Sequence, residues 1–358
     1  MAIEAQRTGA ARIQHVHGRL AARKVMFIVI GLTFLVVLAV VSMSVGSVHL
    51  GMGDICRVIA AKIHITGTKS DAITTAIVWN IRLPRVLMAI VAGMSLAISG
   101  AVMQGTLSNP LVSPYTLGIS SAAGFGAALA IVLGINIADD SYFVVANAFI
   151  FALLAALLVF GIAKIRGVSP ETLILGGIAM MYLFSAGTSL VEYLGSDSAI
   201  ASVVYWLFGS LTSTSWHGLL IVSIVFALCF PLLMKYSWDL NALAAGDEVA
   251  ASLGVNAERV RLIVNTLAVL LTAAVICFTG IIGFICLVAP HITRMIIGSD
   301  HRYVVPCSCI VGALLLLGAD TLGRTVIAPA EIPVGIITAF IGVPLFVYLL
   351  LTRRRQYW

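Results

Sequence analysis

Residues 25–48 read VMFIVIGLTFLVVLAVVSMSVGSV, a stretch of 24 residues without one charged side chain. A helix needs about 20 predominantly apolar residues to cross the hydrocarbon core of a bilayer. A secretory signal has a shorter apolar core, of about 7–15 residues. The stretch therefore predicts a membrane-spanning anchor and not a cleaved signal.

Apolar runs of similar character recur along the rest of the chain. They lie at 84–105, 114–134, 143–164, 171–194, 217–235, 261–281, 284–298, 304–324 and 333–352. Hydrophobic residues make up 61% of the chain and charged residues only 10%, whereas soluble domains average about 45–50% and 25%. A soluble fold with this balance would expose large apolar patches and aggregate, which excludes a soluble enzyme and a nucleic-acid-binding domain. We predict an all-α membrane protein with about ten transmembrane helices.

The basic residues predict how the chain is oriented. Five precede the first span: Arg7, Arg12, Arg19, Arg23 and Lys24. The positive-inside rule places such a segment in the cytoplasm, and ten spans then bring the C-terminus back to the same side. Fifteen of the 21 Lys and Arg residues fall inside in this arrangement. We divide the chain into a basic cytoplasmic segment, 1–24, and a ten-helix domain, 25–358, with both termini cytoplasmic.

Small residues recur at every fourth position in two of the runs. The first set is Gly93, Ala97, Ala101 and Gly105, and the second is Gly118, Ala122, Gly126, Ala130 and Gly134. Such stripes let helix backbones approach closely in lipid, so we expect a compact bundle. A pore-lining stripe is the weaker alternative, because these faces carry few polar groups.

Strongly polar side chains are rare inside the runs, and this limits how the protein could drive transport. Asp320 stands four residues before Arg324 on one helix face, which favours a structural ion pair over a proton relay. The chain has no G-x-x-x-x-G-K-[ST] phosphate loop, no evident catalytic constellation and no evident set of metal ligands. We expect no enzyme activity, no metal and no cofactor on this chain, so active transport would need a partner that supplies energy.

Several motifs, in order along the chain, resemble one family of membrane proteins. Arg82-Leu83-Pro84-Arg85 opens a span, and 100–105 (GAVMQG), 109–111 (NPL) and 117–121 (LGISS) follow. The second half carries 246–248 (GDE), 252–255 (SLGV), 280–284 (GIIGF), 288–291 (VAPH), 298–302 (GSDHR) and 331–335 (EIPVG). From about residue 30 to its end the chain resembles the FecCD permeases. These are membrane subunits of type II ABC importers for iron-siderophores, haem and vitamin B12.

The resemblance implies an assembly in the cytoplasmic (inner) membrane. Two copies of the ten-helix subunit form a homodimer in the lipid bilayer, with the translocation path between them. Two ATP-binding subunits dock on the cytoplasmic side, and an extracytoplasmic substrate-binding protein docks on the other. The expected cargo is a ferric siderophore, the most common role in the family, and haem or vitamin B12 are the alternatives.

The resemblance also implies a coupling helix in the loop between the sixth and seventh spans. The stretch 247–254 is typical of a short helix, because acids in a first turn suit the helix dipole and a glycine can end a helix. The residues concerned are Gly246, Asp247, Glu248, Ala250, Leu253 and Gly254. A merely solvated loop is the alternative.

The connection between the seventh and eighth spans is a candidate gate. It is very short and contains Gly280, Ile281 and Gly283, so its backbone is expected to be irregular. Irregular backbone at membrane depth is tolerated where it is buried in protein or lines a cavity. An ordinary external turn is an equally weighted alternative.

Three arginines at outer helix ends are candidates for docking the binding protein: Arg82, Arg85 and Arg324. By resemblance they would pair with acidic residues on its two lobes, and a guanidinium matches a carboxylate bidentately. The alternative is that they anchor helix ends at the membrane interface.

Two other classes of membrane protein are alternatives to the importer. An ion-coupled secondary carrier would need ionisable groups near the bilayer midplane, and this chain has almost none there. A channel would need a ring of carbonyls or charges, and no filter-like segment is evident.

Overall fold

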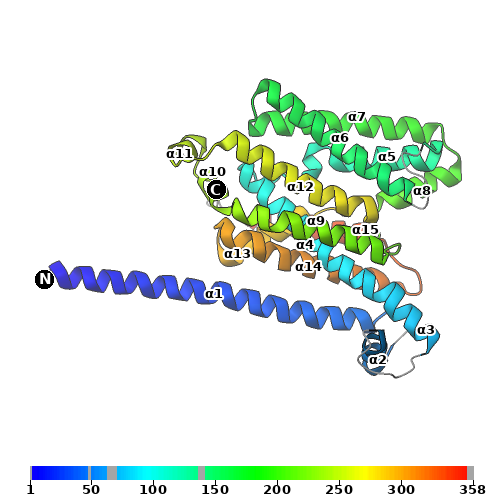
Figure 1. Cartoon of the computed structure of the whole chain (residues 1–358), viewed down its shortest axis with the longest axis horizontal. Coiled ribbons are helices and arrows are strands. Elements are labelled where there is room, and N and C mark those ends of the chain that lie inside the picture. The colour runs from blue at the N-terminus through cyan, green and yellow to red at the C-terminus, as the bar shows by residue number, and fades with distance from the viewer. Residues whose placement is uncertain (1, 47–49, 63–70, 136–141, 353–358) are drawn as a thin grey trace.

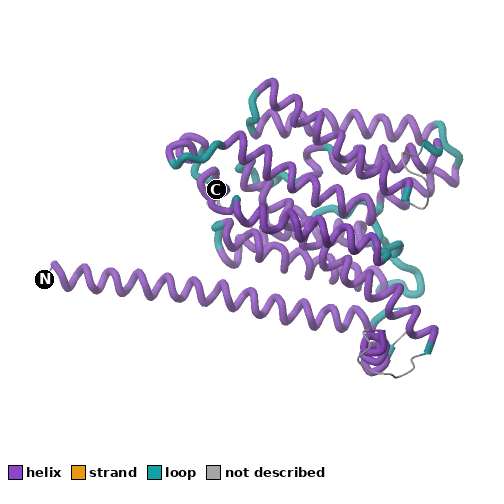
Figure 2. Tube along the Cα trace, viewed as in Figure 1, coloured by secondary structure: helices purple, strands orange, loops and turns teal. Residues whose placement is uncertain are grey.

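The structure, a computed structural model, describes residues 2–46, 50–62, 71–135 and 142–352 of the chain. Within these ranges every regular element is a helix (Figure 2). The helices pack side by side into one bundle, and α1 extends past it (Figure 1).

Ten of the helices in the described ranges are apolar, which confirms the prediction of about ten transmembrane helices. Seven are long enough to cross a bilayer by length and composition, and three are shorter. They are α1 (Ala2–Ser44), α4 (Leu83–Thr106), α5 (Ile119–Leu133), α6 (Phe143–Arg166), α7 (Pro170–Tyr193), α9 (Trp216–Lys235), α12 (Ala257–Thr279), α13 (Ile285–Ile297), α14 (His301–Thr325) and α15 (Val334–Thr352).

The remaining helices are short and lie in the connections. They are α2 (Met52–Lys62), α3 (Ala72–Thr75), the π-helical η1 (Ala76–Arg82), the 3-10 turn η2 (Pro114–Leu117), α8 (Asp197–Leu207), α10 (Ser237–Leu243) and α11 (Asp247–Ser252). Helices α10 and α11 lie at one end of the bundle, and α2 and α3 lie at the other (Figure 1). Following the predicted orientation, we call these the inner end and the outer end.

The first helix contains the predicted span and extends beyond it toward the N-terminus. A span beginning near residue 25 was expected after a separate basic segment, but α1 runs as one helix from Ala2 to Ser44. At about 1.5 Å per residue its 43 residues reach about 65 Å, twice what a bilayer core needs. The division at residue 24 stays a prediction, since no break in the helix marks it. Lys69 and Arg353 to Arg355, which entered the charge count, lie outside the described residues, as do the side chains of 2–22.

The central rod of the bundle is formed by α3, η1 and α4. They follow one another without interruption over 35 residues, from Ala72 to Thr106, and 78% of the most apolar part is buried inside the protein. The outer half of α4 packs into one hydrophobic cluster through residues such as Met88 and Leu96. The inner half packs into a second cluster through Ile98, Val102 and Met103. This helix therefore connects both halves of the core.

Backbone contacts between helices confirm the close packing predicted from the small residues. A Cβ atom added to Gly93 would overlap the backbone of Gly312 in α14, and one added to Gly126 would lie 2.6 Å from the carbonyl oxygen of Asn147 in α6. In lipid such close approach replaces the missing hydrophobic force between helices. The bundle is compact because these positions have no side chain.

Candidate functional site

A short amphipathic helix, α11, protrudes at the inner end of the bundle. It covers residues 247–252, within the stretch 247–254 for which a helix was predicted. Glycines with positive φ flank it, Gly246 at +104° and Gly254 at +82°. This left-handed backbone region favours glycine, which has no Cβ atom. Asp247 and Glu248 lie in its first turn.

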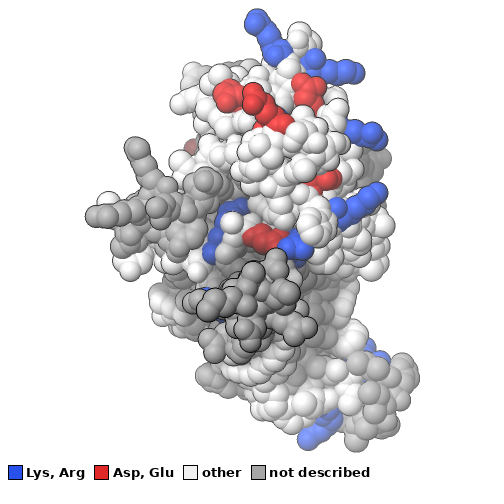
Figure 3. Space-filling model, turned by 90° about the vertical axis from the view of Figure 1, so that its left-hand side faces the viewer, with Lys and Arg blue, Asp and Glu red and all other residues white. Residues whose placement is uncertain are grey.

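The apolar residues of α11 point in two directions. Ala250 is fully buried and belongs to the bundle core, whereas Leu253 is 68% exposed and Val249 is 45% exposed. Ala250 therefore packs α11 against the bundle, whereas Val249, Ala251 and, just after the helix, Leu253 present apolar surface outward. Lys, Arg, Asp and Glu side chains gather over this end of the molecule (Figure 3).

Arg261, in the first turns of α12, ties α11 to the bundle, and the sequence reasoning missed it. Its Nη1 and Nη2 atoms donate to the two carboxylate oxygens of Asp247 at 2.8 and 2.6 Å. Its Nε atom donates to the carbonyl oxygen of Thr106 at 3.0 Å, at the last residue of α4. The Arg261 side chain is only 4% exposed. The hydrogen bond from Arg261 lowers the pKa of Asp247, so this carboxylate stays ionised.

The connection between α12 and α13 has no helical backbone over residues 280–284. This confirms the irregular backbone predicted for the stretch. Helix α13 has 13 residues and spans only about 20 Å, less than the hydrocarbon thickness of about 30 Å. Helix α13 alone is therefore too short to cross the hydrocarbon core, and whether the stretch is a gate or an external turn stays a prediction.

The segment after α8, the α12–α13 connection and the first turn of α15 meet here, and their backbone groups are paired. Ser210 donates its N–H to the carbonyl of Thr279 at 2.7 Å, and Gly335 donates to the carbonyl of Gly209 at 3.2 Å. The hydroxyl of Tyr115 donates to the carbonyl of Ile282 at 2.5 Å. Such pairing is what non-helical backbone requires inside a membrane.

A cavity of about 570 Å³ opens beside the irregular stretch. Its walls come from the end of α8, the α12–α13 connection and α15, and no lining residue is charged. Ile281 and Gly283 line it, together with Phe284, which was not among the predicted site residues. Gly280 lines a second cavity of about 320 Å³ on the side of α6 and α8. Phe284 has a φ of +67°, a strained conformation for a residue with a side chain.

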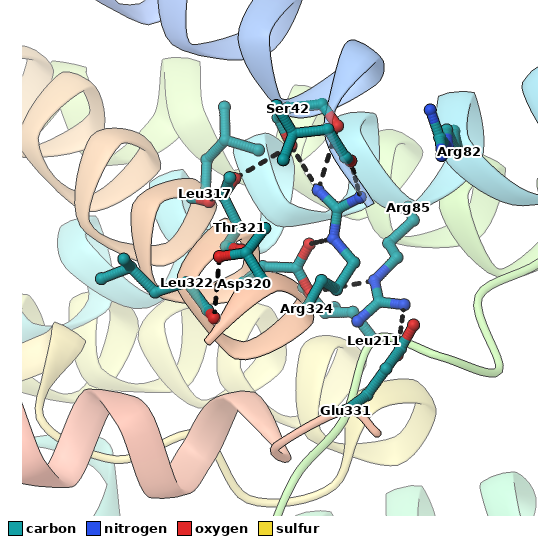
Figure 4. Close-up of polar contacts among 12 residues, drawn as sticks. Ser42, Arg82, Arg85, Leu211, Leu317, Asp320, Thr321, Leu322, Arg324 and Glu331 are labelled. Atoms are coloured by element: carbon teal, nitrogen blue, oxygen red, sulfur yellow. Dashed lines mark hydrogen bonds and ion pairs between the residues drawn. The ribbon is translucent and has the colours of Figure 1, made fainter. Parts of the chain in front are cut away.

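The three candidate docking arginines form a buried cluster at the outer end (Figure 4). Asp320 accepts from Nε of Arg85 at 2.9 Å and from Nε of Arg324 at 3.1 Å, so the predicted pair of Asp320 with Arg324 is present. Arg85 also contacts Glu331 at 2.8 Å. Arg82 donates to the carbonyl of Met43 at 2.7 Å.

These contacts bear on the docking prediction without testing it. Arg82, Arg85 and Arg324 are 5%, 6% and 5% exposed. Each guanidinium already donates to groups of this chain, among them the end of α1, where Arg324 reaches Ser42 Oγ at 2.6 Å. The cluster therefore ties α1, α4 and α14 together.

The fold is that of a polytopic membrane protein: a helical bundle with an apolar cavity beside the non-helical α12–α13 connection and a short amphipathic helix at its inner end. The chain belongs to the FecCD transport family, which residues 34–352 match. This confirms the family resemblance drawn from the motifs.

Known proteins are similar to this chain over most of its length. It is 44% identical over 338 residues to an ABC transporter permease protein of Methanocaldococcus jannaschii, covering 92% of this chain and 95% of that protein. It is 41% identical over 283 residues to the hemin transport system permease protein of Yersinia pestis, covering 78% and 84%. A solved structure described as the inward-facing conformation of a metal-chelate type ABC transporter has a TM-score of 0.79 and 34% identity, covering 91% and 99%.

These likenesses decide the class of the protein. The chain is a multi-pass membrane permease of an ABC importer. It is not itself an ATPase, and membership of an ABC transporter complex implies ATPase partners.

Proposed function

We propose that this permease carries a metal chelate and that its cargo is a ferric siderophore. The observation that carries the proposal is the cavity of about 570 Å³, lined without a charged residue, beside the unwound stretch 280–284. A path without fixed charges offers a bulky chelate few strong contacts, so the cargo can leave as well as enter.

The relatives are named for several cargoes, and the cavity helps to choose among them. The names include hemin, iron(3+)-citrate, cobalamin, iron(3+)-hydroxamate and molybdate. A small oxyanion such as molybdate is held by hydrogen-bond donors or cations, and residues such as Phe208, Ile281 and Phe340 supply none. The apolar lining favours a large chelate, and the iron chelates among the names favour a ferric one.

The cavity also supports a homodimer. It is formed by one chain and opens beside α15, where Phe340 is 75% exposed and Val343 is 44% exposed. If a second copy of the chain covers these side chains, the cavities of the two subunits would face each other and form one central translocation path. Two ATP-binding subunits at the inner end and a substrate-binding protein at the outer end complete the proposed importer.

Specific roles follow for the candidate residues. Gly280, Ile281 and Gly283 form the gate, and the exposed apolar residues of α11 seat in the ATPase. The docking role of Arg82, Arg85 and Arg324 remains a proposal, since their guanidinium groups would have to exchange partners within the cluster.

Reconstitution into proteoliposomes with the ATPase and the binding protein tests the proposal. We expect ATP-dependent uptake of a ferric hydroxamate or ferric citrate that exceeds uptake of haem, cobalamin and molybdate. Preferred uptake of one of the last three would overturn the siderophore assignment. Uptake without ATP, driven by a proton or sodium gradient, would overturn the importer itself.

A further inference from the structure

We infer that Arg261 is the positioning residue through which movement of α11 reaches the cavity wall, by way of α4. The inference rests on the proposed function, since it assumes that an ATPase moves α11. Its basis is an unbroken set of close contacts from the inner end to the α12–α13 connection.

The first step joins α11 to the inner end of α4. Arg261 holds both carboxylate oxygens of Asp247, the first residue of α11, and at the same time the carbonyl of Thr106. A planar guanidinium with five N–H donors can make these bonds together, whereas a lysine ammonium cannot match the bidentate geometry. The same group lies 3.5 Å from the carbonyl of Val168 in the α6–α7 connection. One buried side chain thus fixes the position of α11 relative to the rod.

The second step joins α4 to the cavity wall. Gly100, about 9 Å along the helix from Thr106, packs directly against the backbone of Cys286, so that a Cβ atom there would overlap the Cys286 carbonyl. Cys286 lies in the first turn of α13, two residues after Phe284, which lines the cavity. Because the two backbones touch, α4 cannot shift here without moving the start of α13.

The third step explains why the charge of Arg261 belongs at this place. A cation near the C-terminal end of a helix is favoured by the helix dipole, and Arg261 lies at the last residue of α4. Asp247 is 53% exposed and sits at the start of a helix that faces the partner side. The buried Arg261 is thus bonded to Thr106 inside the bundle, and its partner Asp247 lies at the surface on α11, where an ATPase could move it.

The test compares transport per hydrolysed ATP in the reconstituted importer. For Arg261→Gln we expect assembly and ATP hydrolysis to persist, while substrate transported per ATP falls about tenfold, within the usual range of site-to-site coupling. Arg261→Lys keeps the charge but loses the bidentate bonds, so its ratio also falls. Arg259→Gln is the matched control, because Arg259 is exposed on the same turns of α12, and its ratio stays at the wild-type value.

A merely structural role for Arg261 would lower protein yield and not the ratio. If the Arg261 variants do not assemble, Asp247→Ala provides the test, since it removes both acceptor oxygens and leaves the bond from Arg261 to Thr106 in place. An unchanged transport-to-ATP ratio in every variant that assembles would overturn the inference. If instead the wild-type importer shows no ATP-driven uptake, that result overturns the proposed function. It does not bear on the contact that Arg261 makes between α11 and α4.

Discussion

Asp320 determines the stability of the outer cluster, because each of its carboxylate oxygens holds a different arginine. Oδ1 accepts from Arg85 and Oδ2 accepts from Arg324, and the carboxylate has no solvent exposure. Removing one partner from a buried ion pair leaves an uncompensated charge and costs about 3–5 kcal/mol. In this cluster the Asp320 carboxylate bridges two arginines from different helices, and Glu331 supplies a second negative charge beside Arg85.

Asp320→Asn should therefore destabilise the protein by about 3–5 kcal/mol. The measurement is thermal unfolding of the purified protein in detergent. Asp54→Asn is the control, because Asp54 forms an exposed pair with Arg57 at 3.3 Å, and exposed pairs contribute about 0–1 kcal/mol. Equal melting temperatures for the two variants would contradict the role assigned to Asp320.

The same burial changes how charge reversal at the docking candidates should be read. Arg324→Glu would place a second carboxylate against Asp320, so we expect a lower melting temperature before any effect on the binding protein. Docking affinity should therefore be compared only among variants that keep the wild-type melting temperature. Salt-dependent loss of docking by Arg82→Glu in a stable protein would support the docking role, and unchanged docking at low salt would leave the arginines as helix anchors.

At the scale of helices, glycine positions decide which pairs can touch. Gly100→Ala should strongly destabilise the bundle, because the added Cβ atom would overlap the backbone of Cys286 and backbone cannot move aside cheaply. Gly161→Ala in α6 is the control, since nothing lies within 4 Å of its Cβ position. That variant should be neutral or more stable by up to about 1 kcal/mol, the helix preference of alanine over glycine. Similar yields and melting temperatures for both variants would contradict the close α4–α13 contact.

Helix α11 provides a second prediction at this scale. Leu253→Asp should leave the fold intact and weaken ATPase binding at least about tenfold, because it places a charge on apolar contact surface. Leu253→Met keeps the apolar contact and serves as the control. Ala250→Leu should instead lower stability, since Ala250 is fully buried in the core. Pull-down of the ATPase together with thermal unfolding separates the two effects, and unchanged ATPase binding by Leu253→Asp would contradict the contact.

The sequence predicted helices well because membrane spans are local and long. The runs at 143–164 and 217–235 nearly coincide with α6 and α9. The start of α1 at Ala2 was missed, since the polar residues before 25 do not carry the apolar signal on which the prediction relied. Helix α8 was missed because its 11 residues lie within a connection between two predicted spans. The α11 helix was placed correctly because acids and flanking glycines are local signals.

For the molecule as a whole, the elements could be predicted but their contacts could not. Arg261 contacts Thr106 across 155 positions, and no periodicity links such distant residues. In the sequence Arg261 counted only as one more positive charge on the inner side. Asp320 with Arg324 was predictable because the two stand on one helix face, whereas the partners from α4 and the loop after α14, Arg85 and Glu331, were not. The contacts of Arg261 and of the outer arginine cluster are thus products of tertiary packing around α4.

The cavity beside the α12–α13 connection provides the last prediction, which concerns alternating access. Cys56 is the exposed cysteine among the described residues. The Cys56→Ser variant therefore has no exposed native thiol in the described part of the chain that would react in place of an introduced one. In that background a cysteine at Ile281 should react with a water-soluble maleimide at rates that differ between the ATP-bound and nucleotide-free complexes, because Ile281 lines the cavity.

The control position is Leu157 on α6, which is 67% exposed on the bundle surface but lines none of the described cavities. In a bilayer a cysteine there faces lipid, where a charged reagent does not penetrate, so its labelling should be slow in both nucleotide states. If Ile281 lines the translocation path, its accessibility to water changes during the ATPase cycle. If the cavity is only a static gap in the packing, the accessibility stays the same in both nucleotide states. Equal labelling rates at Ile281 in both states would therefore make the cavity a fixed feature of the subunit and remove it from the translocation path.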